Sequence, residues 1–269
     1  MSETIVVTSC KGGIGKSTVA ANLSMALAMS GFSVLAVDCD FTMRSLDLIM
    51  GLENAYVFNL LDVINKSCEA EKAIVKDSRR EGLYFLAAPP SGSENITVEG
   101  FESALDGIKK NGCGGQKLDY IIIDAPAADS MSVRLAASVS NQAVIVCSHM
   151  PTAIRAAGLT ADILARYGVE NRRLLINSFD ADSALHFNRA GILEMIDESK
   201  VMLLGIVPYD RKLMISQEKG ELIDSFPKKN NARQAFLNIA GRIEGAQIPL
   251  FSALSGAKYR RLTHGGNSR

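Results

Sequence analysis

A glycine-rich segment near the N-terminus combines the residue types that bind phosphate. Residues 10–18 read Cys-Lys-Gly-Gly-Ile-Gly-Lys-Ser-Thr, and they lie between a β-type run at 4–8 and a helical pattern. In a strand–turn–helix of this kind, successive backbone N–H groups and the positive end of the helix dipole face one anion. Lys16 adds a charge for the β- and γ-phosphates, and Ser17 offers a hydroxyl to Mg²⁺. The segment therefore predicts a phosphate-binding loop.

This loop departs from the usual P-loop spacing. The pattern G-x-x-x-x-G-K-[ST] would place glycine at position 10, where this chain has Cys10, and a second lysine, Lys11, lies inside the loop. An exposed loop lysine is usually just solvated. The strand before, the helix after and the doubled lysine nevertheless agree, so we interpret the segment as a particular kind of P-loop.

Aspartates that follow predicted strands supply the acidic chemistry. Asp124 ends the apolar run 120–123, which fits the Walker B position that holds Mg²⁺ directly or through water. Asp38 and Asp40 flank Cys39 after the second strand, and strand alternation puts both carboxylates on one side. One can orient a water near the γ-phosphate while the other supports the metal. Alternatively, the pair is a charged turn that caps the segment after it.

These residues are positioned by apolar strands that alternate with helices. We predict strands at 5–8, 33–37, 83–87, 120–123, 143–147, 173–176 and 203–207, and helices at 17–29, 99–110, 153–167, 188–197 and 231–243. Strands that are apolar throughout indicate an α/β fold, with a mostly parallel sheet flanked by helices on both faces. Ligands bind outside the carboxyl ends of such strands. We therefore expect the loop, Asp38, Asp40 and Asp124 to meet at one rim.

Length and composition limit the other possibilities. The 269 residues are 47% hydrophobic, which suits one large domain. With 29 basic and 29 acidic residues the net charge is zero, which gives no reason to expect a global attraction to nucleic acid. The five cysteines are dispersed without a C-x-x-C. They favour reduced thiols in a cytosolic protein over a disulfide framework or a zinc site.

The sequence resembles the MinD/ParA group of dimeric ATPases, which carry a deviant Walker A loop. Residues 11–18 match that loop, and residues 37–40 with Met-Arg-Ser-Leu-Asp-Leu-Ile-Met-Gly at 43–51 resemble the MinD branch. Shorter matches lie at 124–127, 176–177, 205–208 and 217–221, so the resemblance extends over roughly residues 3–245. It implies a P-loop NTPase domain of the SIMIBI type at 1–245, followed by a C-terminal tail at 246–269.

The resemblance also implies roles for individual residues. Asp40 would position the attacking water, and Lys11 would reach across a homodimer interface to the partner's nucleotide, as an arginine finger does. Asn177 and the backbone around Pro208 would line the adenine pocket. ATP or ADP would otherwise be held by Gly12, Gly13, Ile14, Gly15, Lys16, Ser17 and Thr18, with Mg²⁺ near Ser17, Asp38 and Asp124.

Some positions depart from the family pattern. Ala128 replaces the glycine that usually follows the D-x-P-A segment, which restricts the backbone of switch II. Asn177 is followed by Ser178 instead of arginine, which removes a charged contact near the base. Ala157 and Gly158 occupy the place of an Arg-Asp pair that resembles a partner-binding surface. This last difference leaves the identity of an activating partner open.

The tail resembles a membrane-targeting amphipathic segment. On a helical wheel, one broad face carries Phe251, Leu254, Tyr259 and Leu262, and positive charge for anionic lipid comes from Lys258, Arg260 and Arg261. However, Lys258 falls within the apolar face and Gly256 weakens the helix, so a slightly basic disordered tail is the alternative. Two weak tails on one dimer would bind more strongly than one.

Taken together, the resemblance implies an ATPase that dimerises with Mg-ATP and helps to place the bacterial division site. It would be cytoplasmic, at the inner face of the membrane when ATP-bound, with a division inhibitor and an activating protein as partners. Alternatives are a ParA-like ATPase that partitions DNA or other cargo, and a MinD-like regulator of flagellar number. An iron–sulfur carrier would need cluster cysteines, and a scaffold would bind ATP but hardly hydrolyse it.

Overall fold

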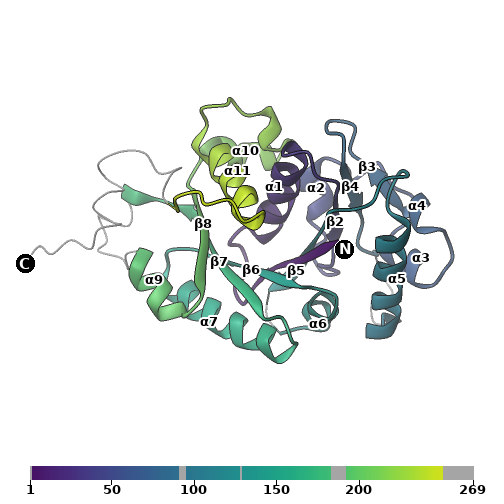
Figure 1. Ribbon diagram of the computed structural model, residues 1–269, viewed down its shortest axis with the longest axis horizontal. Coiled ribbons are helices and arrows are strands. Elements are labelled where there is room, and N and C mark those ends of the chain that lie inside the picture. The colour runs from purple at the N-terminus through teal and green to yellow at the C-terminus, as the bar shows by residue number, and fades with distance from the viewer. Residues whose placement is uncertain (1, 91–94, 128, 183–191, 251–269) are drawn as a thin grey trace, which may run out of the picture.

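The computed structural model describes residues 2–90, 95–127, 129–182 and 192–250 (Figure 1). They contain one eight-stranded sheet with the order β3-β4-β2-β5-β1-β6-β7-β8. Neighbouring strands are parallel except for β3 and β4. The strands are β1 (Glu3–Ser9), β2 (Val34–Asp38), β3 (Ile74–Lys76), β4 (Leu83–Leu86), β5 (Tyr120–Ala127), β6 (Gln142–Cys147), β7 (Asn171–Phe179) and β8 (Met202–Pro208).

Helices cover both faces of this sheet. One apolar cluster joins the sheet to α1 (Lys16–Met29), α2 (Leu46–Met50), α10 (Arg211–Gln217), the 3₁₀ turn η2 (Ile223–Ser225) and α11 (Asn231–Ile243). The other joins it to α3 (Leu60–Ile64), α4 (Ala70–Ala73), α5 (Val98–Asn111), α6 (Met131–Ser138), α7 (Pro151–Arg166) and α9 (Ile192–Ser199). Figure 1 shows α1, α10 and α11 on the side of the sheet opposite α7 and α9. The expected mostly parallel sheet between helical layers is confirmed.

The apolar strands explain why the sheet lies in the middle of the molecule. Every residue of β2 and β4 is buried, and so are the first six residues of β5, Tyr120–Ala125. A strand that must bury both faces cannot alternate apolar and polar residues, so its pattern is a continuous apolar run. The helix α1 is also buried around most of its surface, because it packs between the sheet and α11.

All seven predicted strands are present, with shifted ends, and the structure adds β3, a short antiparallel strand at the sheet edge. The predicted helices at 17–29, 99–110, 153–167 and 231–243 correspond to α1, α5, α7 and α11. The predicted helix at 188–197 corresponds to α9 from residue 192, and its first residues lie outside the described part. The helices that sequence patterns missed span four to eight residues, too few turns for a helical period.

The chain continues past α11 to residue 250, and residues 251–269 of the predicted tail lie outside the described part, as does Ala128. The division into a domain at 1–245 and a tail at 246–269 therefore stays a prediction. Within the described residues, none of the helices combines the length and the apolar character needed to cross a lipid bilayer.

Candidate functional site

The strand order brings the predicted site residues to one rim. β1 lies beside β5, and β5 lies beside β2, so the segments that leave these three strands are neighbours. Asp38 at the end of β2 is in register with Asp124 of β5. The backbone N–H of Cys39 donates to the Asp124 carbonyl over 2.8 Å, which extends the pairing past the end of β2. The glycine-rich loop, Asp38, Asp40 and Asp124 therefore meet as predicted.

The loop between β1 and α1 has the backbone shape of a phosphate cradle. Gly13 and Gly15 have φ angles of 73° and 86°, in the left-handed region that favours glycine. Gly15 is the N-cap of α1, so the free N–H groups of the first helical turn face the site. Lys16, the first residue of that turn, is only 9% exposed. A buried lysine beside free backbone donors favours a strongly anionic ligand.

We expect Gly15→Ala to abolish tight nucleotide binding. A Cβ at Gly15 would lie 2.4 Å from Nδ2 of Asn177 and would also have to tolerate φ of 86°. The strain costs about 1–2 kcal/mol, and displacement of Asn177 would disturb the cavity beside the loop. Titration of the protein with ADP checks binding, and thermal unfolding checks the fold. Gly12→Ala is the matched control, because a Cβ at Gly12 meets nothing within 4 Å. Equal affinities of the two variants for ADP would contradict this account of the loop.

Asp38, the last residue of β2, and Asp40, two residues beyond it, both cap backbone N–H groups. Asp38 accepts from Asp40 N over 2.9 Å and from Leu46 N over 3.3 Å. Oδ1 of Asp40 accepts from Thr42 N over 3.2 Å and from Met43 N over 3.0 Å. The alternative interpretation of this pair as a capped turn is thus structurally correct. It does not exclude chemistry, because the same bonds hold both carboxylates beside the phosphate loop.

Burial makes the adjacent carboxyl groups of Asp38 and Asp124 weaker acids than usual. Burial raises the pKa of Asp124 to about 7, opposed by the Ser17 hydroxyl and the Lys16 ammonium. Burial, together with the charge of Asp124, also raises the pKa of Asp38 well above its ordinary value. Two buried carboxylates side by side destabilise each other as anions. A cation between them and the phosphates would remove that penalty.

The residues present fit a magnesium ion bound together with phosphate. Both oxygens of Asp124 are buried without a well-formed hydrogen bond from the described residues, although the Ser17 hydroxyl is near enough to favour the charged carboxylate. Ser17 lies on the loop side, where its hydroxyl accepts from Ser45 over 2.9 Å. In residues 2–90, 95–127, 129–182 and 192–250, no group of three His, Cys, Asp or Glu side chains could hold a metal. A site with few carboxylates agrees with the preference of Mg²⁺ for one or two of them plus substrate phosphates.

Lys11 points to a different element in this single chain. Its Nζ donates to Oγ1 of Thr152 at the start of α7, over 2.9 Å. The hydroxyl of Ser9 donates to the Lys11 carbonyl over 2.8 Å and fixes the backbone of the loop at this position. The predicted reach of Lys11 to a partner's nucleotide therefore requires the side chain to leave Thr152.

A cavity of about 420 Å³ continues from the loop towards α10. Asn177 lines it and donates from Nδ2 to the Ile14 carbonyl over 2.8 Å, while its buried Oδ1 lacks a hydrogen bond from the described residues. Ser178, with φ of 52°, turns the chain at the cavity wall. Sequence reasoning assigned no role to four further lining residues from the segment after β8, which are Asp210, Leu213, Met214 and Gln217.

Pro208, the other predicted base contact, ends β8 and is not among the residues that line this cavity. Gln217 instead closes it, since its Oε1 accepts from the Thr18 hydroxyl over 2.6 Å. The only sequence signal for Gln217 was its place in the matched stretch 217–221. A contact between α10 and the loop, 199 residues apart, depends on the tertiary structure.

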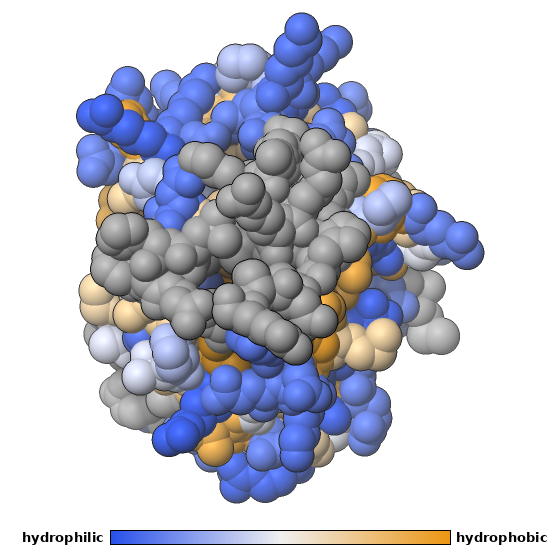
Figure 2. All heavy atoms as spheres, turned by 90° about the vertical axis from the view of Figure 1, so that its left-hand side faces the viewer, coloured by the Kyte–Doolittle hydropathy of each residue, from blue (hydrophilic) through white to orange (hydrophobic). Residues whose placement is uncertain are grey.

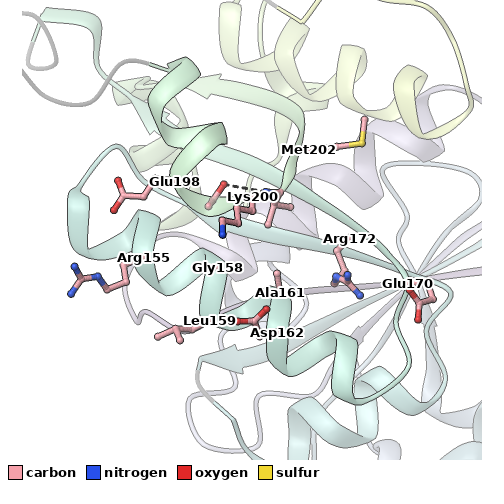
Figure 3. A pocket seen from close by; sticks show the side chains of 12 residues that line it. Arg155, Gly158, Leu159, Ala161, Asp162, Glu170, Arg172, Glu198, Lys200 and Met202 are labelled. Carbon is pink, nitrogen blue, oxygen red and sulfur yellow. Dashed lines mark hydrogen bonds between the residues drawn. The ribbon is translucent and has the colours of Figure 1, made fainter.

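A second cavity of about 410 Å³ lies between α7 and α9. Figure 3 shows charged side chains of both signs around it, including Arg155, Glu198 and Lys200. The residues predicted for nucleotide or metal binding do not line it. Gly158, one of the departures from the family pattern, does.

Comparisons with known proteins agree with the geometry of the rim. The profile described as the CobQ/CobB/MinD/ParA nucleotide binding domain matches residues 5–223. Septum site-determining protein MinD of Synechocystis sp. is 36% identical over 256 residues, which is 95% of this chain and 94% of that protein. The protein of the same name from Bacillus subtilis is 36% identical over 253 residues, 93% of this chain and 92% of that protein.

Solved structures show the same similarity. A chain of the MinC:MinD cell division protein complex of Aquifex aeolicus has a TM-score of 0.84 and 34% identity, covering 93% of this chain and 98% of that chain. Septum site-determining protein MinD of Pyrococcus horikoshii OT3, complexed with Mg-ADP, has a TM-score of 0.78 and 25% identity, covering 92% and 100%. The likeness thus extends over nearly the whole chain in both sequence and fold.

Proposed function

The chain belongs to the MinD branch of the CobQ/CobB/MinD/ParA nucleotide-binding family, whose members share a P-loop ATPase fold, and on this premise we propose that it hydrolyses ATP in an ATP-dependent homodimer that helps to place the division site. The observation that carries the proposal is the buried pair Asp38 and Asp124 beside the loop with Lys16 and Ser17. A cation would neutralise these neighbouring carboxylates, whose pKa values are raised, and the loop supplies donors for the phosphates.

In this proposal, the residues of the rim have different roles in ATP hydrolysis. The loop N–H groups and Lys16 bind the phosphates, and Ser17 with Asp124 and Asp38 holds the metal region. Bound with the nucleotide, Mg²⁺ would neutralise charge that develops on the phosphate oxygens. Asp40 accepts a proton from the attacking water and orients it, since its two backbone hydrogen bonds use Oδ1.

The cavity beside the loop suits an adenine base. The buried Oδ1 of Asn177 accepts no hydrogen bond from the described residues, so a ligand that donates one is favoured here. The 6-amino group of adenine is such a donor. Guanine presents an oxygen at that position, which would leave two acceptors facing each other. We therefore propose that Asn177 selects ATP over GTP.

Lys11 makes hydrolysis depend on dimerisation. In the single chain its ammonium is held by Thr152, and one hydrogen bond to an exposed hydroxyl contributes only about 1 kcal/mol. A partner's γ-phosphate offers a charge-assisted bond in exchange. Lys11 then stabilises the charge on the phosphoryl group in transfer, as an arginine finger does.

The placement of the division site rests on the relatives. Both proteins compared above by sequence are named septum site-determining proteins, and one similar structure is a MinC:MinD complex. We therefore propose a division inhibitor as one partner of this chain. The Arg-Asp pair of the family is Ala157 and Gly158 here, so an activating partner would not find that pair on this chain.

Membrane attachment in this proposal depends on residues 246–269. On the side of the molecule that carries β8 and α9, hydrophobic residues form separate patches among hydrophilic ones (Figure 2). Exposed apolar side chains there include Leu193 and Met202. Scattered exposure of this kind is ordinary for a protein surface. A dimer would present two amphipathic tails, which together would bind anionic lipid more strongly than one tail does.

The test of the proposal is sedimentation with vesicles that contain anionic phospholipid. We expect the intact chain to sediment at least about 10-fold more strongly with Mg-ATP than with Mg-ADP, because only the dimer presents two tails. A chain that ends at Gly245 should dimerise with ATP but stay in the supernatant, and size-exclusion chromatography measures the dimer. Equal sedimentation with both nucleotides would overturn the membrane switch. Salt-sensitive, ATP-dependent binding to non-specific DNA would instead favour a partitioning ATPase.

A further inference from the structure

Two short helices contact the candidate nucleotide site from opposite sides. α2 begins on the metal side, where Ser45 donates to Ser17 and Leu46 N donates to Asp38. α10 lies on the base side, where Gln217 at its end accepts from Thr18 over 2.6 Å. Ser17 and Thr18 are consecutive residues of α1, so both helices are tied to one turn of the loop helix.

The C-terminal end of α2 contacts the segment that follows α10. Gly51 ends α2 with φ of 63°, and Gly220 follows α10 with φ of 62°. A Cβ on Gly220 would lie 2.4 Å from the Gly51 Cα, and a Cβ on Gly51 would lie 2.8 Å from the Gly220 carbonyl oxygen. The backbones therefore touch directly, and only glycine permits this approach.

The guanidinium of Arg79 holds this contact closed. Nη1 donates to the Gly220 carbonyl over 2.5 Å, and Nη2 donates to the Met50 carbonyl. Nε donates over 2.9 Å to Oδ1 of Asp77, whose side chain is 1% exposed. One planar group thus joins α2, the segment after α10 and the turn between β3 and β4. Lysine cannot reproduce this arrangement, because its ammonium is a single point donor on a flexible stem.

Charge keeps Arg79 in place. Asp77 pairs with it over 2.5 Å, and the charge of the guanidinium also opposes the effect of burial on the pKa of Asp224. Because Asp77 is buried and Asp224 is partly buried, breaking this network costs more than breaking an exposed ion pair. The clamp is therefore a fixed part of the fold around α2 and α10.

We propose that Arg79 is a positioning residue that couples the metal side of the nucleotide site to its base side by clamping α2 against the segment after α10. The proposal rests on the function proposed above, because it concerns the same site. With the clamp intact, seating the base against α10 also fixes α2, and with it Ser45, Ser17 and Asp38. Two ligands that favour one arrangement of the same elements strengthen each other's binding.

The test measures how much Mg²⁺ tightens ADP binding, which needs no catalysis. Isothermal titration of the full-length chain with ADP, with Mg²⁺ and with EDTA, gives this ratio of affinities. We expect Arg79→Lys to lower the ratio at least about fivefold, within the range typical of such coupling. Arg80→Lys is the matched control, since Arg80 binds the carbonyls of Ala28 and Met29 at the end of α1 instead. It should change the ratio less than twofold.

A second variant tests the contact without touching Arg79. Gly51→Ala should push α2 away from Gly220 and lower the same ratio. Thermal unfolding accompanies every titration, so a general loss of fold is distinguished from a loss of coupling. Intact ADP binding with an unchanged ratio in Arg79→Lys would overturn the inference alone. If the unaltered chain bound no ADP, the proposed function and the inference would fall together.

Discussion

Asp40→Asn is expected to lower the turnover of ATP by about 10²–10⁴-fold, the usual contribution of a positioned general base. Asparagine keeps an Oδ1 that can accept from Thr42 N and Met43 N, so the turn after β2 stays formed. It removes the negative charge and the proton acceptor. Affinity for ATP should therefore change less than about threefold, because the loss falls on the transition state. Steady-state release of phosphate and titration with a non-hydrolysable analogue measure the two quantities.

The control for charge alone is Asp106→Asn, whose side chain is 75% exposed on α5. This variant should hydrolyse ATP like the unaltered chain. A turnover in Asp40→Asn within threefold of normal would show that Asp40 only shapes the turn. The chain would then be closer to an ATP-binding scaffold, or another group would activate the water.

Mixing two inactive variants tests whether Lys11 acts in trans. Lys11→Gln should also be inactive, although it should still bind ADP as a monomer. In a mixed dimer with Asp40→Asn, one of the two sites has its own Asp40 and receives Lys11 from the partner. An equal mixture should therefore regain roughly a quarter of normal activity, since half of the dimers are mixed and each has one complete site. No recovery on mixing would indicate that Lys11 acts within its own chain.

Asp124→Asn is expected to stabilise the nucleotide-free protein while weakening its response to metal. Burial raises the folded pKa of Asp124 to about 7, above its unfolded value. The folded state therefore binds more protons than the unfolded state between about pH 4 and pH 7, and its stability falls as the pH rises through that window. Above pH 7 the full penalty is present. Removing the charge also relieves Asp38, whose pKa the Asp124 carboxylate raises.

Thermal unfolding across pH checks this prediction. At pH 8 the gain should be about 2 kcal/mol, or roughly 5 °C in Tm, and it should shrink towards pH 5. Mg²⁺ should tighten ADP binding about 10–100-fold less than in the unaltered chain. A variant that was destabilised equally at pH 5 and pH 8 would show that Asp124 supports the fold by packing and carries no charge penalty. Such a trade of stability against function is common at sites of this kind.

The local features of the site could be predicted from sequence because they depend on neighbours along the chain. The loop at residues 10–18, the apolar strand before Asp124 and the second strand before Asp38 are each contained in about ten residues. Parallel strands place their carboxyl ends at one rim, so convergence also followed from pattern. The capping bonds of Asp38 and Asp40 did not, since they depend on how the backbone turns after β2.

The remaining features depend on pairs of residues that only folding brings together. Thr18 meets Gln217, Lys11 meets Thr152, and Arg79 meets both Met50 and Gly220. No periodicity marks such pairs, because a periodic pattern indicates which face of an element is apolar and does not indicate which distant residue will contact it.

The sequence by itself determined the phosphate loop, the mostly parallel sheet and the rim at which the carboxylates gather. Each of these follows from residue types that a strand, a glycine turn or a helix start requires locally. The tertiary structure alone decided that Asp124 lies fully buried against Asp38, and that α2 and α10 meet beneath the site at Gly51 and Gly220. Burial and backbone contact depend on the packing of whole elements, and this packing gives the carboxylates their raised pKa values and makes the two sides of the site one unit.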